Sequence, residues 1–153
     1  MRVAILQFPG SNCDWDAEHA VMDVLGIPAK RIWHKSELPP ETEAVIVPGG
    51  FSFGDYLRCG AIAQFSPIMK DLKEFSERGG SILGICNGFQ ILCESGLLPG
   101  ALIRNDCIVF RCLNQPLKVE DSNDRFNINS LGEDLILPIA HGEGNYCADE
   151  STL

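Results

Sequence analysis

The chain has 153 residues, of which 12 are basic and 21 are acidic, so its formal net charge is −9. This charge argues against nucleic acids and anionic membranes as partners, because both repel an acidic surface. No apolar run is long enough to cross a membrane, and the predicted N-terminal strand is too short for a secretory signal. The length predicts a single domain over residues 1–153.

The seven cysteines are odd in number and contain no C-x-x-C pair. This pattern is typical neither of a zinc site nor of a secreted disulfide framework, so we expect no metal. A reducing cytoplasm is the compartment that the cysteines favour.

Predicted strands and helices alternate in the first half of the chain. We expect strands at 3–8, 31–33, 44–47 and 82–85, and helices at 14–25, 62–78 and directly after residue 86. Such alternation predicts an α/β fold with an open, mostly parallel sheet and helices on both faces. Beyond Gly100 the pattern changes to short strands, expected at 108–110, 117–119 and 135–137, with a turn at 121–124.

The most informative motif is Gly-Ile-Cys-Asn-Gly at residues 84–88. Cys86 stands between an apolar strand pattern and an apolar helical pattern, with Gly84 and Gly88 two residues to either side. This spacing is typical of a nucleophile elbow, a sharp strand-to-helix turn that presents one reactive side chain. The N-terminus of the following helix favours the thiolate. We therefore predict Cys86 as a nucleophile, with a buried structural cysteine as the alternative.

Two further glycine loops follow predicted strands, at residues 9–10 and at Pro48-Gly49-Gly50. The carboxyl ends of parallel strands share one edge of a sheet, so these loops are expected to lie near Cys86. Backbone N–H groups of Gly49 and Gly50, with that of Asn87, can form an oxyanion hole. An ordinary tight turn is the alternative for the two glycines.

Residues 84–90 and 48–50 together resemble the class I, or triad, glutamine amidotransferases, whose fold is flavodoxin-like. The segments at 9–14, 49–58, 96–100 and 138–144 are similar, more narrowly, to the glutaminase subunits of phosphoribosylformylglycinamidine synthase. The resemblance runs from the first residue to the last.

The resemblance implies that Cys86 attacks the side-chain amide of L-glutamine, giving a glutamyl thioester and ammonia. Gln90 would hold the glutamine, and Gly142 and Glu143 would meet its amino-acid end. The ammonia would pass to a synthetase subunit, joined by a small accessory subunit. That partner would use ATP and Mg to convert formylglycinamide ribonucleotide to the amidine in purine synthesis, and the chain itself would bind no cofactor.

The sequence departs from the family pattern near its end. The family's catalytic base is a histidine in a His-Pro-Glu motif, and the chain ends at Leu153 without one. We therefore expect a C-terminally incomplete domain that exposes an apolar sheet edge.

Each of the three histidines has a non-catalytic interpretation. His19 is expected on the surface of the first helix or in packing, and His34 is expected to be solvated. His141 with Glu143 imitates a His-x-Glu pair, but its neighbours match a different family loop, so it is left out of the catalytic set.

Other polar residues carry weaker signals. Cys13 also lies between a strand and a helix, but it lacks the paired glycines and is expected to be structural. Asp55, Tyr56 and Arg58 are expected either at the mouth of the site or a partner interface, or in a solvated loop.

Two other functions remain open from the sequence. A catalytically inactive domain could bind only glutamine or the synthetase. A stress protein of the related cysteine-elbow superfamily is the other alternative, although such proteins usually carry a histidine where Asn87 stands.

Overall fold

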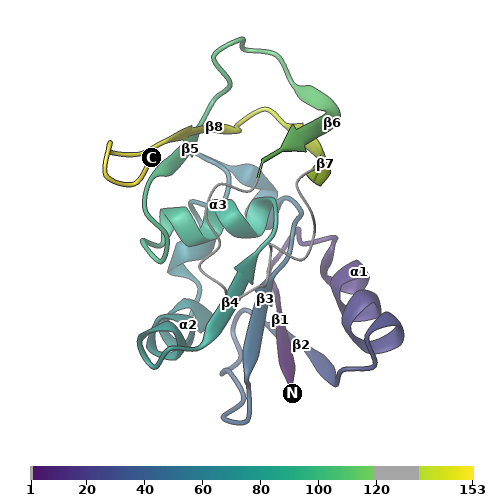
Figure 1. Ribbon diagram of the computed structural model, residues 1–153. Helices are drawn as coiled ribbons and strands as arrows, with labels where there is room; N and C mark the ends of the chain where they lie inside the picture. The colour runs from purple at the N-terminus through teal and green to yellow at the C-terminus, as the bar shows by residue number, and fades with distance from the viewer. Residues whose placement is uncertain (1, 119–134) are drawn as a thin grey trace. The chain divides into compact units, whose positions relative to one another are not determined.

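Four parallel strands form the central sheet of the computed structural model, which describes residues 2–118 and 135–153 (Figure 1). The strand order is β2-β1-β3-β4, and every pairing is parallel. The strands are β1 (Val3–Gln7), β2 (Ala29–Trp33), β3 (Ala44–Val47) and β4 (Ser81–Gly84). The expected open parallel sheet is confirmed.

Helices cover both faces of this sheet, as predicted (Figure 1). Side chains alternate along β1, so Ala4 and Leu6 enter a core with residues of α2 and α3. Val3 and Ile5 face the other side and pack with Val21. The helices are α1 (Asp14–His19), which continues as a π-helical turn (Ala20–Val24), α2 (Ile68–Glu77) and α3 (Asn87–Glu94).

The single helix predicted over residues 62–78 is wrong in its first part. Ala63–Phe65 is a separate 3-10 turn, and α2 begins at Ile68. Pro67 disfavours helical backbone at the residue before it, and Ser66 is extended, with ψ of 141°. The apolar periodicity therefore runs across two elements that proline separates.

Strand β4 lies at one end of the strand order in the described part of the chain. Leu83 in this strand is 39 % exposed, and the following Ile85 is 46 % exposed. An apolar edge of this kind favours pairing with another chain unless something covers it. The exposed apolar side chains at β4 agree with the expectation of an apolar sheet edge.

Residues 103–145 form a compact unit of their own, separate from the unit made by residues 1–102 and 146–153. Within it, β6 (Arg111–Leu117) pairs antiparallel with β7 (Leu135–His141). The strand predicted at 135–137 is confirmed and continues to His141. Of the strand predicted at 117–119, Leu117 is the last residue of β6, and Lys118 lies outside any strand. Residue 119 and the turn predicted at 121–124 lie outside the described residues.

The strand predicted at 108–110 is wrong. Ile108 has a φ angle of 59°, a left-handed conformation that no regular strand accommodates. Two short strands were not predicted, β5 (Ala101–Ile103) and β8 (Asn145–Cys147), which pair with each other. Three residues are too few to show an alternating pattern.

Candidate active site

Cys86 occupies the turn between β4 and α3. Its backbone has φ of 52° and ψ of −112°, a combination that is sterically unfavourable for any residue with a Cβ. The turn closes through the Gly88 N–H, which donates to the Ile85 carbonyl at 2.8 Å. The Cys86 side chain is exposed. The predicted elbow geometry is therefore present.

The two glycines around Cys86 allow α3 to approach the sheet closely. A Cβ on Gly84 would lie 2.6 Å from the Leu92 side chain and 3.0 Å from the Gly88 backbone. A Cβ on Gly88 would overlap the carbonyl group of Val47. Neither position has room for a side chain, which explains the paired-glycine spacing.

The glycine loop after β3 lies directly beside this turn. A Cβ at Gly49 would be 3.3 Å from the Cys86 Cβ and 3.5 Å from the Cys13 Sγ. Gly50 has φ of +138°, and Ser11 forms an isolated β-bridge with it. The three loops that follow β1, β3 and β4 thus converge, as their positions after parallel strands predict.

Asn87 and Gln90 are buried at 2 % and 8 % exposure, respectively. Asn87 Nδ2 donates to Gln90 Oε1 at 3.0 Å, and Asn87 Oδ1 accepts from the Ser52 N–H at 3.0 Å. The Ser52 contact was not predicted, because 35 positions separate the two residues and no local pattern marks the pair. The described geometry leaves the substrate-binding roles of Asn87 and Gln90 as predictions.

Cys13 is the thiol that lies across Gly49 from Cys86. Burial, followed by the nearby Asp16, Cys86 and Asp14 charges, raises the pKa of the Cys13 thiol. A raised pKa reduces the thiolate fraction at neutral pH. The structural role predicted for Cys13 is consistent with this environment.

The prediction for His34 is wrong, because this side chain is only 4 % exposed. Its Nδ1 lies 3.0 Å from Ser66 Oγ, and its ring packs edge-on against Phe53. Burial, and secondarily Lys35, lowers the pKa of His34. The sequence suggested solvation because a lysine follows, but backbone contacts of His34 to Gln7 and Ile68 hold it inside.

His19 is on the surface of the first helix, as one of its two predicted roles requires. Its Nδ1 lies 2.7 Å from Asp23 Oδ2, and both side chains are about two-thirds exposed. Of the loop residues with weaker signals, Tyr56 is 73 % exposed. Arg58 makes a two-pronged ion pair with Glu94, at 2.8 and 2.9 Å.

In the unit of residues 103–145, the buried Asn105 organises the loop at 141–144. Its Nδ2 donates to the Val109 and His141 carbonyls at 2.9 and 3.0 Å. Its Oδ1 accepts from the Gly144 N–H at 2.9 Å and lies 3.0 Å from His141 Nδ1. An oxygen that can only accept indicates that His141 Nδ1 carries the proton. Gly142 and Glu143 lie in this loop half-buried, and their share in glutamine binding stays a prediction.

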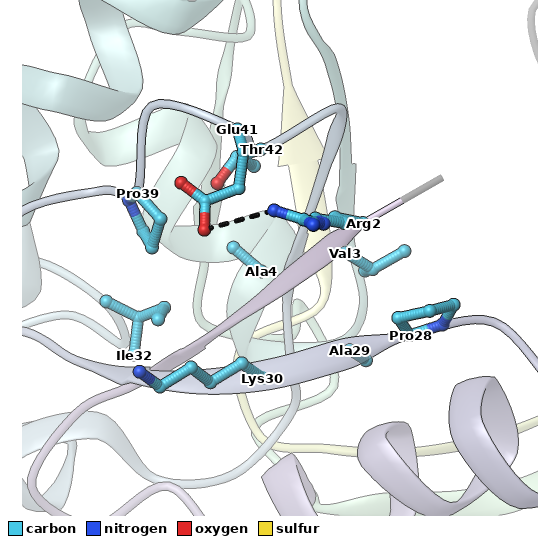
Figure 2. Close-up of a pocket in the computed structure, with 10 residues that line it drawn as sticks. All are labelled: Arg2, Val3, Ala4, Pro28, Ala29, Lys30, Ile32, Pro39, Glu41 and Thr42. Atoms are coloured by element: carbon cyan, nitrogen blue, oxygen red, sulfur yellow. Dashed lines mark ion pairs between the residues drawn. The ribbon is translucent and has the colours of Figure 1, made fainter.

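A pocket of about 210 Å³ lies at the amino-terminal ends of β1 and β2 (Figure 2). Arg2 and Glu41 pair across it at 3.4 Å. Ligands of open parallel sheets bind beyond the carboxyl ends of the strands. The pocket is therefore a feature distinct from the Cys86 turn.

Within residues 2–118 and 135–153, no three His, Cys, Asp or Glu side chains are grouped so that they could hold a metal ion. In the same residues, no helix has both the length and the apolar character needed to span a bilayer.

The strand-to-helix cysteine and the adjacent glycine loop are features of a glutamine amidotransferase. The CobB/CobQ-like glutamine amidotransferase domain matches residues 1–153, and the chain belongs to this family. Its curated relatives include the phosphoribosylformylglycinamidine synthase subunit PurQ of Salinibacter ruber, 53 % identical over 153 residues, and that of Alkaliphilus metalliredigens, 54 % identical over 154 residues.

These alignments cover 99 % and 100 % of the chain but 65 % and 68 % of the two relatives. Among solved structures, that of PurLQS from Thermotoga maritima matches with a TM-score of 0.90 and 43 % identity. The match covers 97 % of the chain and 70 % of the Thermotoga chain. The fold predicted from the sequence is thus the fold of this family.

Proposed function

We propose that this chain carries the glutaminase centre of a phosphoribosylformylglycinamidine synthase, with L-glutamine as substrate and Cys86 as nucleophile. The observation that supports this most is the strained backbone of Cys86, with φ of 52°, beside the Gly49–Gly50 turn. Strain of this kind costs about 1–3 kcal/mol and is retained mainly at functional sites. The PurQ relatives point to the same activity.

The proposed reaction begins when the Cys86 thiolate bonds to the amide carbon of glutamine. The carbonyl electrons move onto oxygen, and the backbone N–H groups of Gly50 and Asn87 stabilise this oxyanion. The carbon–nitrogen bond then breaks, and the nitrogen takes a proton and leaves as ammonia. Water hydrolyses the remaining thioester to glutamate and restores the thiol.

Gln90, Gly142 and Glu143 are the residues that we propose to hold the glutamine. The proton for the leaving nitrogen is not assigned to His19 or His34, since the first pairs with Asp23 and the second is buried against Ser66. His141 is also left out, because its Nδ1 is engaged by Asn105.

The ammonia would be consumed by an ATP- and Mg-dependent synthetase subunit, with a small accessory subunit in the same complex. The structure of PurLQS from Thermotoga maritima supports an assembly of this kind. The cytoplasm is the proposed location, because the cysteine pattern is not that of a secreted disulfide framework.

Ammonia release from glutamine tests the proposed function, with and without a synthetase partner. Cys86→Ser should abolish release, whereas Cys112→Ser, at another exposed thiol, should leave it unchanged. Equal release by wild type and Cys86→Ser would contradict the proposal. Glutamine binding without any release by the wild type would favour the inactive glutamine-binding alternative.

A further inference from the structure

The backbone that follows the Gly49–Gly50 turn takes an unusual course. Phe53, Asp55 and Leu57 have φ angles of 54°, 53° and 69°. The left-handed conformation costs roughly 1–2 kcal/mol for a residue with a Cβ. Three such residues in five positions persist only where surrounding contacts hold them.

Asn87, the residue after the nucleophile, contacts two residues of this loop, one of which is the left-handed Asp55. Its buried side chain accepts from the Ser52 N–H at 3.0 Å and donates to Asp55 Oδ1 at 3.2 Å. It also donates to Gln90 Oε1 at 3.0 Å. One amide therefore joins the strained segment to the first turn of α3.

The Ser52 N–H and the Asp55 carboxylate together determine which way this amide points. The Ser52 N–H can only donate, so it requires the Asn87 oxygen, and the Asp55 carboxylate accepts, so it requires the Asn87 nitrogen. A reversed amide would place two donors together at Ser52 and two acceptors together at Asp55. The carboxylate thus favours the same orientation as the Ser52 N–H, the one in which Asn87 holds Ser52.

The residues directly after Leu57 also lie against α3, at two positions. Arg58 donates from Nε and Nη2 to the two carboxylate oxygens of Glu94. A Cβ at Gly60 would lie 2.8 Å from the Ile91 backbone nitrogen. The segment is therefore held along the helix whose N-cap is Cys86.

We propose that Asp55 is a positioning residue for the reaction at Cys86. Through Asn87 it fixes Ser52, and with Ser52 the Gly49–Gly50 turn, against the nucleophile. The inference rests on the proposed function, in which Gly50 donates to the oxyanion. An oxyanion donor stabilises the transition state and hardly stabilises the ground state. Displacing the donor therefore lowers kcat and leaves KM unchanged.

Two substitutions at Asp55 separate the hydrogen bond from the backbone strain. Asp55→Gly removes the carboxylate and relieves the left-handed strain. Asp55→Asn keeps an oxygen acceptor and tolerates the same backbone conformation. Asp23→Asn, at an exposed carboxylate that pairs with His19, is the matched charge control.

Glutamine hydrolysis by the full chain, with a synthetase partner where release requires it, gives the readout. Asp55→Gly should lower kcat by about tenfold or more, equivalent to 1.4 kcal/mol of lost transition-state stabilisation, with KM within about twofold of wild type. Asp55→Asn should stay within about threefold of wild type in kcat, since it retains the acceptor. Asp23→Asn should match wild type.

A lower melting temperature for Asp55→Gly with unchanged kcat would make the contact merely structural and overturn the inference. An equal loss of kcat in Asp55→Gly and Asp55→Asn would also overturn it, because the acceptor alone would then not suffice. If Asp55→Gly does not fold, Asp55→Ser takes its place and should likewise lower kcat while leaving KM unchanged. A wild-type chain that neither releases ammonia nor takes up a glutamine-analogue electrophile at Cys86 would instead refute the proposed function itself.

Discussion

Gly88 rests on the backbone of Val47 so closely that a Cβ added to Gly88 would overlap the Val47 carbonyl group. Val47 is the last residue of β3, and Gly88 lies in the first turn of α3. The Val47 carbonyl also accepts the Ile85 N–H at 3.0 Å. The elbow therefore packs on the end of the neighbouring strand as well as on its own strand.

Gly88→Ala should destabilise the protein, because the methyl group must displace sheet backbone or the start of α3. Overpacking of this kind costs about 1–3 kcal/mol, and more where backbone must move. Urea unfolding followed by circular dichroism measures the loss. Gly79→Ala is a control, since a Cβ there meets nothing within 4 Å and only the left-handed φ of +82° is strained. Equal losses in the two variants would contradict the close approach at Gly88.

Gly50→Ala should lower glutamine hydrolysis by about two to three orders of magnitude, the range for one lost oxyanion donor. A Cβ at Gly50 would lie 2.9 Å from the Asn12 backbone nitrogen, and φ is +138°, so the turn must shift. Ammonia release is the measurement, with a thermal melt to show that the variant is folded. Unchanged turnover in a folded variant would return Gly50 to a purely structural role.

His34 should make part of the stability depend on pH. Its pKa is lowered in the folded state from an ordinary value of 6.5, so below that pH the unfolded chain binds more protons than the folded one. The free energy of unfolding should then decrease as pH falls through 6.5, by up to about 1.4 kcal/mol per pH unit for this group, until the folded pKa is reached.

Urea unfolding between pH 5 and pH 8 tests this dependence. His34→Gln should show a shallower slope below pH 6.5 than wild type. The same slope in wild type and His34→Gln would show that His34 does not titrate differently on folding.

The sequence predicts the elbow well because its signal is local. A strand pattern, a cysteine and two glycines within five residues suffice to identify the turn at Cys86. The converging loops also follow from the parallel topology, since strands β1, β3 and β4 end at one edge.

Contacts between distant segments could not be predicted in the same way. The buried His34 ring contacts Ser66, 32 positions away, and the Asn87 amide contacts Asp55, whose backbone is left-handed. Neither partner is marked by periodicity or spacing. The prediction of one helix from residue 62 was wrong, because the apolar periodicity continues past Pro67 although the proline disfavours helical backbone at the residue before it.

The central claim is that Cys86 is the nucleophile for glutamine, and two other thiols make the choice of probe important. Hydrogen bonding at Val109 and then Arg111 lowers the pKa of the exposed Cys107 thiol, so a general alkylating agent will also label that residue. The pKa of Cys13 is raised instead. A probe shaped like glutamine therefore tests recognition as well as thiol reactivity.

The most direct measurement is the mass of the folded chain, and of its peptides, after treatment with a diazo-ketone analogue of glutamine. We expect a single adduct on Cys86 that excess glutamine suppresses, that Cys86→Ser abolishes and that Cys13→Ser retains. An adduct that forms first on Cys13 or Cys107, or one on Cys86 that glutamine does not suppress, would contradict the account.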